Sequence, residues 1–170
     1  VAIEPVDGFL SDHYDPRHKV LRLSPQVYQG HSMAAVGVAA HEAGHAIQDA
    51  RHYTPLVVRN AVVPMASFGS GISWILIMLG MFFSATLVWA GIAAFACVVF
   101  FQLVNLPVEF DASVRAKEQL ATLGIVRWPE QRYVSKVLNA ATWTYVAATL
   151  QSVLTLLYFV LRFGGLGRHE

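Results

Sequence analysis

The chain has 170 residues, of which 55% are hydrophobic and 14% charged, with a mean hydropathy of +0.48. This length allows one domain or a compact two-part protein, and the apolar fraction exceeds what the core of a soluble domain needs, so we expect a membrane protein. The net charge of +1 gives no reason to expect a nucleic-acid partner, and the single Cys97 excludes an internal disulfide. The chain begins without Met or a signal-peptide pattern, so we expect a processed or truncated form.

Residues 1–60 predict a small β-hairpin followed by helices. Short alternating runs flank Asp15-Pro16, a dipeptide that favours turns. Ser24 and Pro25 suit the cap and the first turn of a short helix. Ser32 can cap a second helix, which we expect to run to about His52.

A long uncharged segment follows these helices. The 48 residues from Ala61 to Val108 contain no Asp, Glu, Lys, Arg or His, which is long enough for two membrane crossings of about 20 residues each. We therefore predict a transmembrane helical hairpin over 61–106, with its break near 80–85. A third transmembrane helix is predicted over 137–162, because this stretch is again almost wholly apolar. We expect residues 107–136 to form a further helix, which carries Glu109, and a connecting segment, and residues 163–170 to form a tail.

A two-span hairpin returns the chain to the side of the membrane that it left. The segments 1–60 and 107–136 therefore share one side, and the tail lies on the other. Ten of the twelve Lys and Arg residues fall on the first side: Arg17, Lys19, Arg22, Arg51, Arg59, Arg115, Lys117, Arg127, Arg132 and Lys136. The positive-inside rule makes that side cytoplasmic.

The segment 36–52, VGVAAHEAGHAIQDARH, places three titratable side chains in an apolar helix. His41, Glu42 and His45 form the pattern H-E-x-x-H. Residues four apart lie on one helical face, so both imidazoles can bind one metal ion, whereas Glu42 lies about 100° away. Zinc lowers the pKa of a bound water towards neutral, and a carboxylate can accept its proton as the water attacks a carbonyl. Glu42 is therefore the predicted general base.

A catalytic zinc ion needs a third protein ligand and one open position. Glu109 and Asp111, in LPVEFDASVRA, are the first charged residues after the predicted membrane hairpin. Side chains at i and i+2 of a helix point apart, so only one of the two can bind the metal. We predict Glu109 as the third ligand, and Asp111 at most bonds to another ligand.

These motifs, in this order, resemble the bacterial membrane-bound neutral zinc metallopeptidase family. The resemblance rests on VGVAAHEAGHAIQ, the two-span hairpin and LPVEFDASVRA, and it runs from DHYDP and LRLSP to LATLGI. The arrangement is also similar to the wider group of membrane zincins that includes the heat-shock and CAAX-prenyl proteases. The resemblance implies that His41, His45 and Glu109 bind one Zn2+ and that Glu42 is the general base.

The fold class that we expect is a mainly α membrane protein of a bacterial plasma membrane. It would have zincin-like catalytic helices, a small N-terminal β-hairpin and about three transmembrane helices. One position departs from the wider group, where an Asp one turn after the ligand glutamate bonds to a metal-bound histidine. Here that position is Ser113. Either Asp111 takes this role through a shifted backbone, or Ser113 does.

Three further residues are weaker candidates for contact with the substrate. His52 would lie on the His41 face of a continuing helix, but a helix-end histidine at the membrane interface is the alternative. His13 could approach the site from the hairpin or could stabilise its turn. Arg115 is a candidate stabiliser of the transition state, with Tyr133 and Asn139 as alternatives that the spacing does not rank. Either flank of the hairpin could bind a substrate backbone as an added strand.

We expect a membrane-embedded zinc endopeptidase that cuts peptides or membrane proteins at the cytoplasmic surface of the bilayer. Two alternatives stay open. One is an intramembrane metalloprotease of the site-2 type, although charged residues follow the motif within two turns and no later span carries an Asp. The other is a non-enzymatic membrane scaffold that binds zinc.

Overall fold

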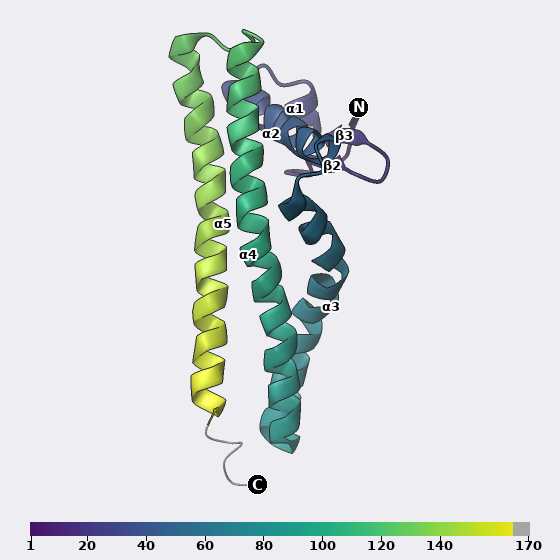
Figure 1. Ribbon diagram of the computed structural model, residues 1–170, viewed down its shortest axis with the longest axis vertical. Coiled ribbons are helices and arrows are strands. Elements are labelled where there is room, and N and C mark those ends of the chain that lie inside the picture. Colours follow the sequence, from purple (N-terminus) through teal and green to yellow (C-terminus); the bar gives the residue numbers. More distant parts are fainter. Residues whose placement is uncertain (165–170) are drawn as a thin grey trace. The chain divides into compact units, whose positions relative to one another are not determined.

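The computed structural model describes residues 1–164 (Figure 1). The elements of this part of the chain are β1 (Ala2–Pro5), β2 (His13–Asp15), β3 (Val20–Leu23), α1 (Pro25–Tyr28), α2 (Met33–Ala50), α3 (Thr54–Phe83), α4 (Ala85–Thr122) and α5 (Trp128–Phe163). A mainly helical protein with a small N-terminal sheet and three long apolar helices confirms the predicted fold class. The tail predicted over 163–170 lies outside the described residues from 165 onward.

The sheet contains the predicted hairpin and one strand that was not predicted. Strands β2 and β3 pair antiparallel, with Tyr14 opposite Leu21. The turn between them is fixed by Asp15, whose carboxylate accepts from the backbone N–H groups of Arg17 and His18. Strand β1 pairs parallel with β3, so the strand order is β1-β3-β2. Strand β2 therefore has one edge that is not paired within the sheet.

The ends of the short helices follow the expected capping chemistry only in part. Ser32 caps α2, because its hydroxyl accepts from the N–H of Ala35 at 3.1 Å. Ser24 precedes Pro25 at the start of α1, but its hydroxyl donates to Asp12 instead of capping the helix. Helix α2 ends at Ala50, two residues earlier than expected.

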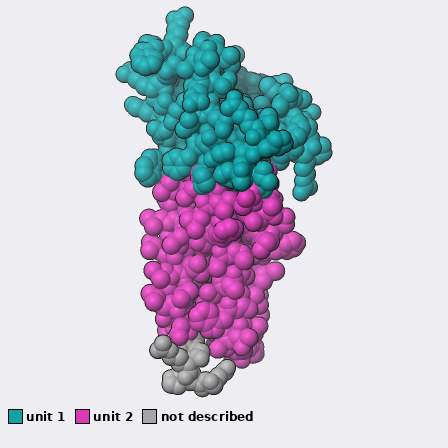
Figure 2. All heavy atoms as spheres, in the orientation of Figure 1, with its two compact units in different colours: residues 1–57, 107–144 teal, residues 58–106, 145–170 magenta. Residues whose placement is uncertain are grey.

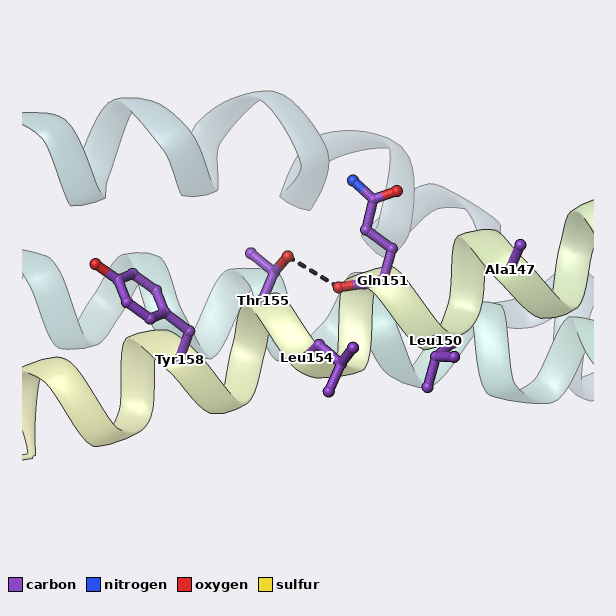
Figure 3. Close-up of a pocket in the computed structure, with 6 residues that line it drawn as sticks. All are labelled: Ala147, Leu150, Gln151, Leu154, Thr155 and Tyr158. Carbon is purple, nitrogen blue, oxygen red and sulfur yellow. Dashed lines mark hydrogen bonds between the residues drawn. The ribbon is translucent and has the colours of Figure 1, made fainter.

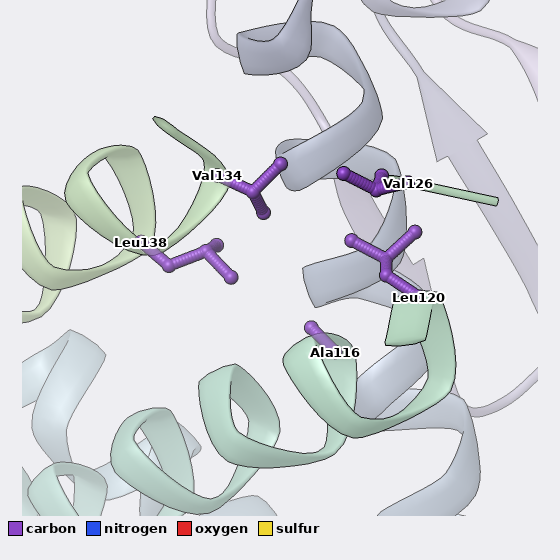
Figure 4. Packing of buried hydrophobic residues seen from close by; sticks show 5 residues of the cluster. All are labelled: Ala116, Leu120, Val126, Val134 and Leu138. Atoms are coloured by element: carbon purple, nitrogen blue, oxygen red, sulfur yellow. The ribbon is translucent and has the colours of Figure 1, made fainter. Parts of the chain in front are cut away.

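Two compact units make up the described chain (Figure 2). Unit 1 comprises residues 1–57 and 107–144, and unit 2 comprises the rest. Unit 1 has a buried apolar cluster to which α4 contributes Ala116 and Leu120 and α5 contributes Val134 and Leu138. Val126, from the loop between these helices, completes the cluster (Figure 4). The cluster holds the ends of α4 and α5 and the loop between them together, and residues of α2 pack against it.

Unit 2 is built from long apolar helices. Helices α3 and α4 approach closely at Gly91. A Cβ added there would lie only 2.8 Å from the backbone nitrogen of Ile77. Small residues at such crossings are typical of membrane helices. By length and composition, α3, α4 and α5 could each cross a membrane. Helix α4 continues beyond the predicted second span, through Pro107, to Thr122, so this span and the helix expected to carry Glu109 form one helix.

The surface of unit 2 suits a lipid environment. A shallow pocket follows α5 and is lined by Ala147, Leu150, Gln151, Leu154, Thr155 and Tyr158 (Figure 3). The hydroxyl of Thr155 donates to the backbone carbonyl of Gln151 at 2.9 Å, so the helix satisfies this polar group internally. Large apolar side chains such as Phe82 and Leu161 are exposed, as expected for groups that face lipid tails.

Candidate metal centre and active site

Two histidines of α2 and one glutamate of α4 converge within unit 1. The Nε2 atom of His41 lies 3.1 Å from Oε2 of Glu109, and Nε2 of His45 lies 3.8 Å from the same oxygen. One ligand atom from each residue lies within 4.8 Å of the others. His45 and Glu109 are buried. Residues 68 positions apart in the sequence thus meet at one point.

This donor set fits zinc. Tetrahedral zinc with bonds of about 2.0–2.2 Å places neighbouring ligand atoms about 3.3–3.6 Å apart. The two nitrogen–oxygen distances to Glu109, 3.1 and 3.8 Å, lie on either side of this range. Two imidazoles and one carboxylate are also the donors of many catalytic zinc sites, where the fourth position stays open.

Gln48 fixes the ring of His45. Its Oε1 lies 2.9 Å from Nδ1 of His45. Since an amide oxygen only accepts, His45 donates from Nδ1, and its Nε2 is directed towards Glu109. The amide nitrogen of Gln48 donates to the carbonyl of Val108 and to Asp111, both at 2.8 Å. The fully buried Gln48 therefore connects α2 to the turn of α4 that carries Glu109.

A chain of hydroxyl groups orients the ring of His41. Ser113 Oγ lies 3.2 Å from Nδ1 of His41 and 3.4 Å from Oγ1 of Thr142. Thr142 donates its own hydrogen to the carbonyl of Leu138 at 2.8 Å, so it can only accept from Ser113. Ser113 then accepts from Nδ1–H of His41, which directs Nε2 towards Glu109. Of the two alternatives left by the sequence, Ser113 contacts His41, and Asp111 reaches His45 through Gln48.

Gly44, between the two histidines, lets α4 come close to α2. A Cβ at this position would lie 2.5 Å from the backbone carbonyl oxygen of Ala112, a separation at which one of the helices must move. Ala112 is fully buried and lies three residues after Glu109. The absence of a side chain in the second variable position of H-E-x-x-H is therefore part of how Glu109 reaches the histidines.

The carboxyl group of Glu42 is buried beside the three candidate ligands. Its Oε2 accepts from the backbone N–H of Tyr14 at 3.0 Å. Burial raises the pKa of Glu42 to about 7, although His41 lowers it, and the neighbouring Glu109 adds to the rise. A carboxyl group with a pKa near neutral can both accept and return a proton.

The other predicted residues differ in their placement. Arg115 donates to Asp111 at 2.5 Å and lies over the ring of Tyr53, so it supports the carboxylate that holds Gln48. The ring of His13 bonds to the carbonyl of Ser11 in its own loop, at 2.7 Å. His52 follows the end of α2 with an exposed side chain and a left-handed φ of 51°. It does not continue the His41 face, because the helix stops before it.

Two contacts at the site were not predicted from the sequence. Gln48 lies three residues after His45, so helical spacing alone could have indicated that it contacts the ring. Tyr14 contacts Glu42 from 28 positions away, and no local pattern marks that pairing.

Comparison with known proteins gives the same family as the motifs. The model of a family described as "Putative neutral zinc metallopeptidase" matches residues 1–164. The chain is 49% identical over 164 residues to the "Putative membrane protease YugP" of Bacillus subtilis (strain 168), a match that covers 96% of this chain and 73% of that protein. No solved structure matches the chain. With its H-E-x-x-H helix and the glutamate of α4 in place, the chain belongs to the neutral zinc metallopeptidase family.

Proposed function

We propose that the protein is a membrane-embedded endopeptidase that binds one zinc ion per chain and hydrolyses peptide bonds at the cytoplasmic surface of the plasma membrane. The observation that carries this proposal is the meeting of His41, His45 and Glu109 beside the buried carboxyl group of Glu42. This arrangement contains three metal donors and a separate proton acceptor, the two parts that zinc-dependent hydrolysis requires.

The residues of the chain have distinct roles in the proposed reaction. His41, His45 and Glu109 would hold the metal, which supplies a water of lowered pKa and polarises a carbonyl oxygen. Glu42 accepts the proton of the attacking water and returns it to the leaving amine. Gln48 and Ser113 hold the two imidazole rings in the orientation that presents Nε2.

The length and composition of the helices support a site at the membrane surface. The three helices that could cross a membrane are α3, α4 and α5, and α2 is not among them. This favours a surface site over the intramembrane alternative. Ten of the twelve Lys and Arg residues lie in segments 1–60 and 107–136, so the positive-inside rule places these segments in the cytoplasm. Membrane proteins or peptides that reach this surface would be the substrates.

Zinc content and peptide cleavage, measured on purified variants, test the proposal. We expect about one zinc ion per wild-type chain and none in His45→Ala, because two donors no longer complete the site. Glu42→Gln should retain zinc but lose cleavage of a peptide library by at least about a hundredfold, since the amide cannot accept the proton. His31→Ala is the matched control, because His31 is exposed and lies outside the motif.

Each result has a clear reading. Equal zinc in wild type and His45→Ala would remove the assigned metal site. Full activity in Glu42→Gln would remove Glu42 as the base. Stoichiometric zinc with no cleavage by the wild type would favour the zinc-binding scaffold over the peptidase.

A further inference from the structure

Tyr14, in the edge strand β2, contacts α2 at two places. Its backbone N–H donates to Oε2 of Glu42 at 3.0 Å, and its hydroxyl donates to Oδ2 of Asp49 at 2.6 Å. Glu42 and Asp49 are seven residues apart, which is nearly two full turns, so they lie on the same face of α2 about 10 Å apart along its axis. Tyr14 thus lies lengthwise along this face and connects the catalytic motif to the end of the helix.

A second residue of the hairpin strengthens the contact at Asp49. Lys19, in the turn between β2 and β3, also donates to Oδ2 of Asp49. Burial tends to raise the pKa of Asp49, but the hydrogen bonds from Lys19 and Tyr14 outweigh it, so the pKa is lowered. The carboxylate is therefore charged at neutral pH and binds both strand β2 and the turn of the hairpin. We call Tyr14, Lys19 and Asp49 the hairpin clamp.

The N–H of Tyr14 can donate to Glu42 because it makes no hydrogen bond within the sheet. Successive N–H groups of a strand point in opposite directions. The N–H of Tyr14 points to α2, so those of His13 and Asp15 point to β3, with which this strand pairs. This donor belongs to the backbone and not to a mobile side chain, so its position is fixed by the position of strand β2.

We propose that Tyr14 is a positioning residue for Glu42, held in register by the hairpin clamp. Its N–H occupies Oε2 of the glutamate and so leaves Oε1 to accept the proton of the attacking water. This role rests on the proposed peptidase function. The contact itself exists without metal or substrate, and it can be tested separately.

Amide hydrogen exchange on the metal-free protein, followed by NMR in detergent micelles, tests the contact. We expect the Tyr14 amide to be protected in the wild type and to exchange at least about tenfold faster in Glu42→Ala, because its acceptor is lost. The amides of His13 and Asp15 face β3 and serve as internal controls that should change little. Equal exchange of Tyr14 in both proteins would overturn the proposal, whatever the enzyme does.

The role in turnover is tested by comparing Tyr14→Pro with Tyr14→Ala. Both variants lack the ring and the hydroxyl, but only proline also lacks the N–H. Proline is tolerated on an edge strand where its nitrogen faces away from the sheet, as it does here. With any peptide that the wild type cleaves, we expect kcat to be about ten- to hundredfold lower in Tyr14→Pro than in Tyr14→Ala, the effect of one hydrogen bond to a charged group.

Zinc content and KM separate positioning from damage to the fold. Both variants should retain zinc and keep KM within about twofold of each other, because the lost group contacts neither metal ligand nor substrate. Equal kcat values in the two variants would overturn the role in turnover. If Tyr14→Pro does not fold, Asp49→Asn and Tyr14→Phe replace it. Each weakens the clamp but keeps the N–H, so kcat should fall several-fold at unchanged KM, and unchanged kcat in both would contradict the clamp.

Discussion

At the scale of single residues, the candidate site depends on side chains that are not among the candidate metal ligands. Gln48 uses all of its polar atoms at once, on His45, Asp111 and the carbonyl of Val108. A glutamine in a fully buried position is costly unless each group is satisfied. Gln48 meets this requirement, and one of its partners is the ring of the candidate ligand His45.

We predict that Gln48→Leu lowers zinc affinity by about ten- to a hundredfold, because His45 loses the acceptor that fixes its ring. Leucine has a similar volume, so the packing of α2 should be little changed. Competition with a chromophoric zinc chelator measures the affinity. Gln26→Leu, at an exposed position of α1, is the control and should bind zinc like the wild type. Equal affinity in Gln48→Leu would contradict the assigned role.

At the scale of the elements, the approach of α2 to α4 is set by the glycine between the histidines. We predict that Gly44→Ala loses most of its zinc, because the added Cβ would meet the backbone carbonyl of Ala112 at 2.5 Å and push Glu109 away. Gly37→Ala is the matched control on the same helix, where the nearest atom is a methyl group of Val134 at 3.4 Å. Zinc content and thermal unfolding measure both.

The two variants separate geometry from helix propensity. Alanine favours a helix over glycine by about 1 kcal/mol, so Gly37→Ala should be at least as stable as the wild type. Normal zinc binding by Gly44→Ala would show that the helices adjust without loss of the site.

The hairpin should leave α2 in acid. A hydrogen bond from His18, together with backbone amides and Arg22, holds the pKa of Asp15 well below its usual range, and the pKa of Asp49 is also lowered. Groups whose folded pKa lies below the unfolded value stabilise the fold above the unfolded pKa, near 3.9, and lose this effect as the pH falls further. We therefore predict that the protection of amides in the hairpin, taken relative to the intrinsic exchange rate at each pH, falls below about pH 4.

Hydrogen exchange between pH 6 and pH 3 measures this change. Asp49→Asn should show a smaller dependence on pH, because one of the two titrating carboxylates is gone. A dependence equal to that of the wild type would assign the acid effect to other groups.

The sequence predicts those parts of the fold that depend on neighbours in the chain. Helical spacing places His41 and His45 together, and the length of the uncharged segment predicts the two spans. Strand β1 was missed because its parallel pairing with β3 depends on segments that are not joined by a tight turn. Tyr14 was missed for a similar reason, since an edge strand carries no local mark of the helix that it contacts. The sequence separates the second span from the helix that carries Glu109, whereas α4 runs through Pro107 as one helix.

At the scale of the whole molecule, the spans and the charge distribution predict one orientation. This orientation can be tested in a Cys97→Ser background with a single cysteine introduced by Thr122→Cys, at the end of α4, or by Ser84→Cys, in the turn between α3 and α4. An impermeant thiol reagent should label position 84 in intact cells and position 122 only after permeabilisation. The reverse pattern would invert the orientation, and labelling of both positions from one side would exclude the α4 crossing.

The distance in sequence between the metal donors has a consequence for the energetics of the whole chain. A metal ion bound by both residue 41 and residue 109 would be a reversible crosslink between α2 and α4. An ion that binds only the folded chain stabilises it by about 4 kcal/mol when its concentration is a thousand times the dissociation constant. The difference between the melting temperatures with and without chelator would then report the metal occupancy of the site. It would rank metal ions and variants alike without any substrate.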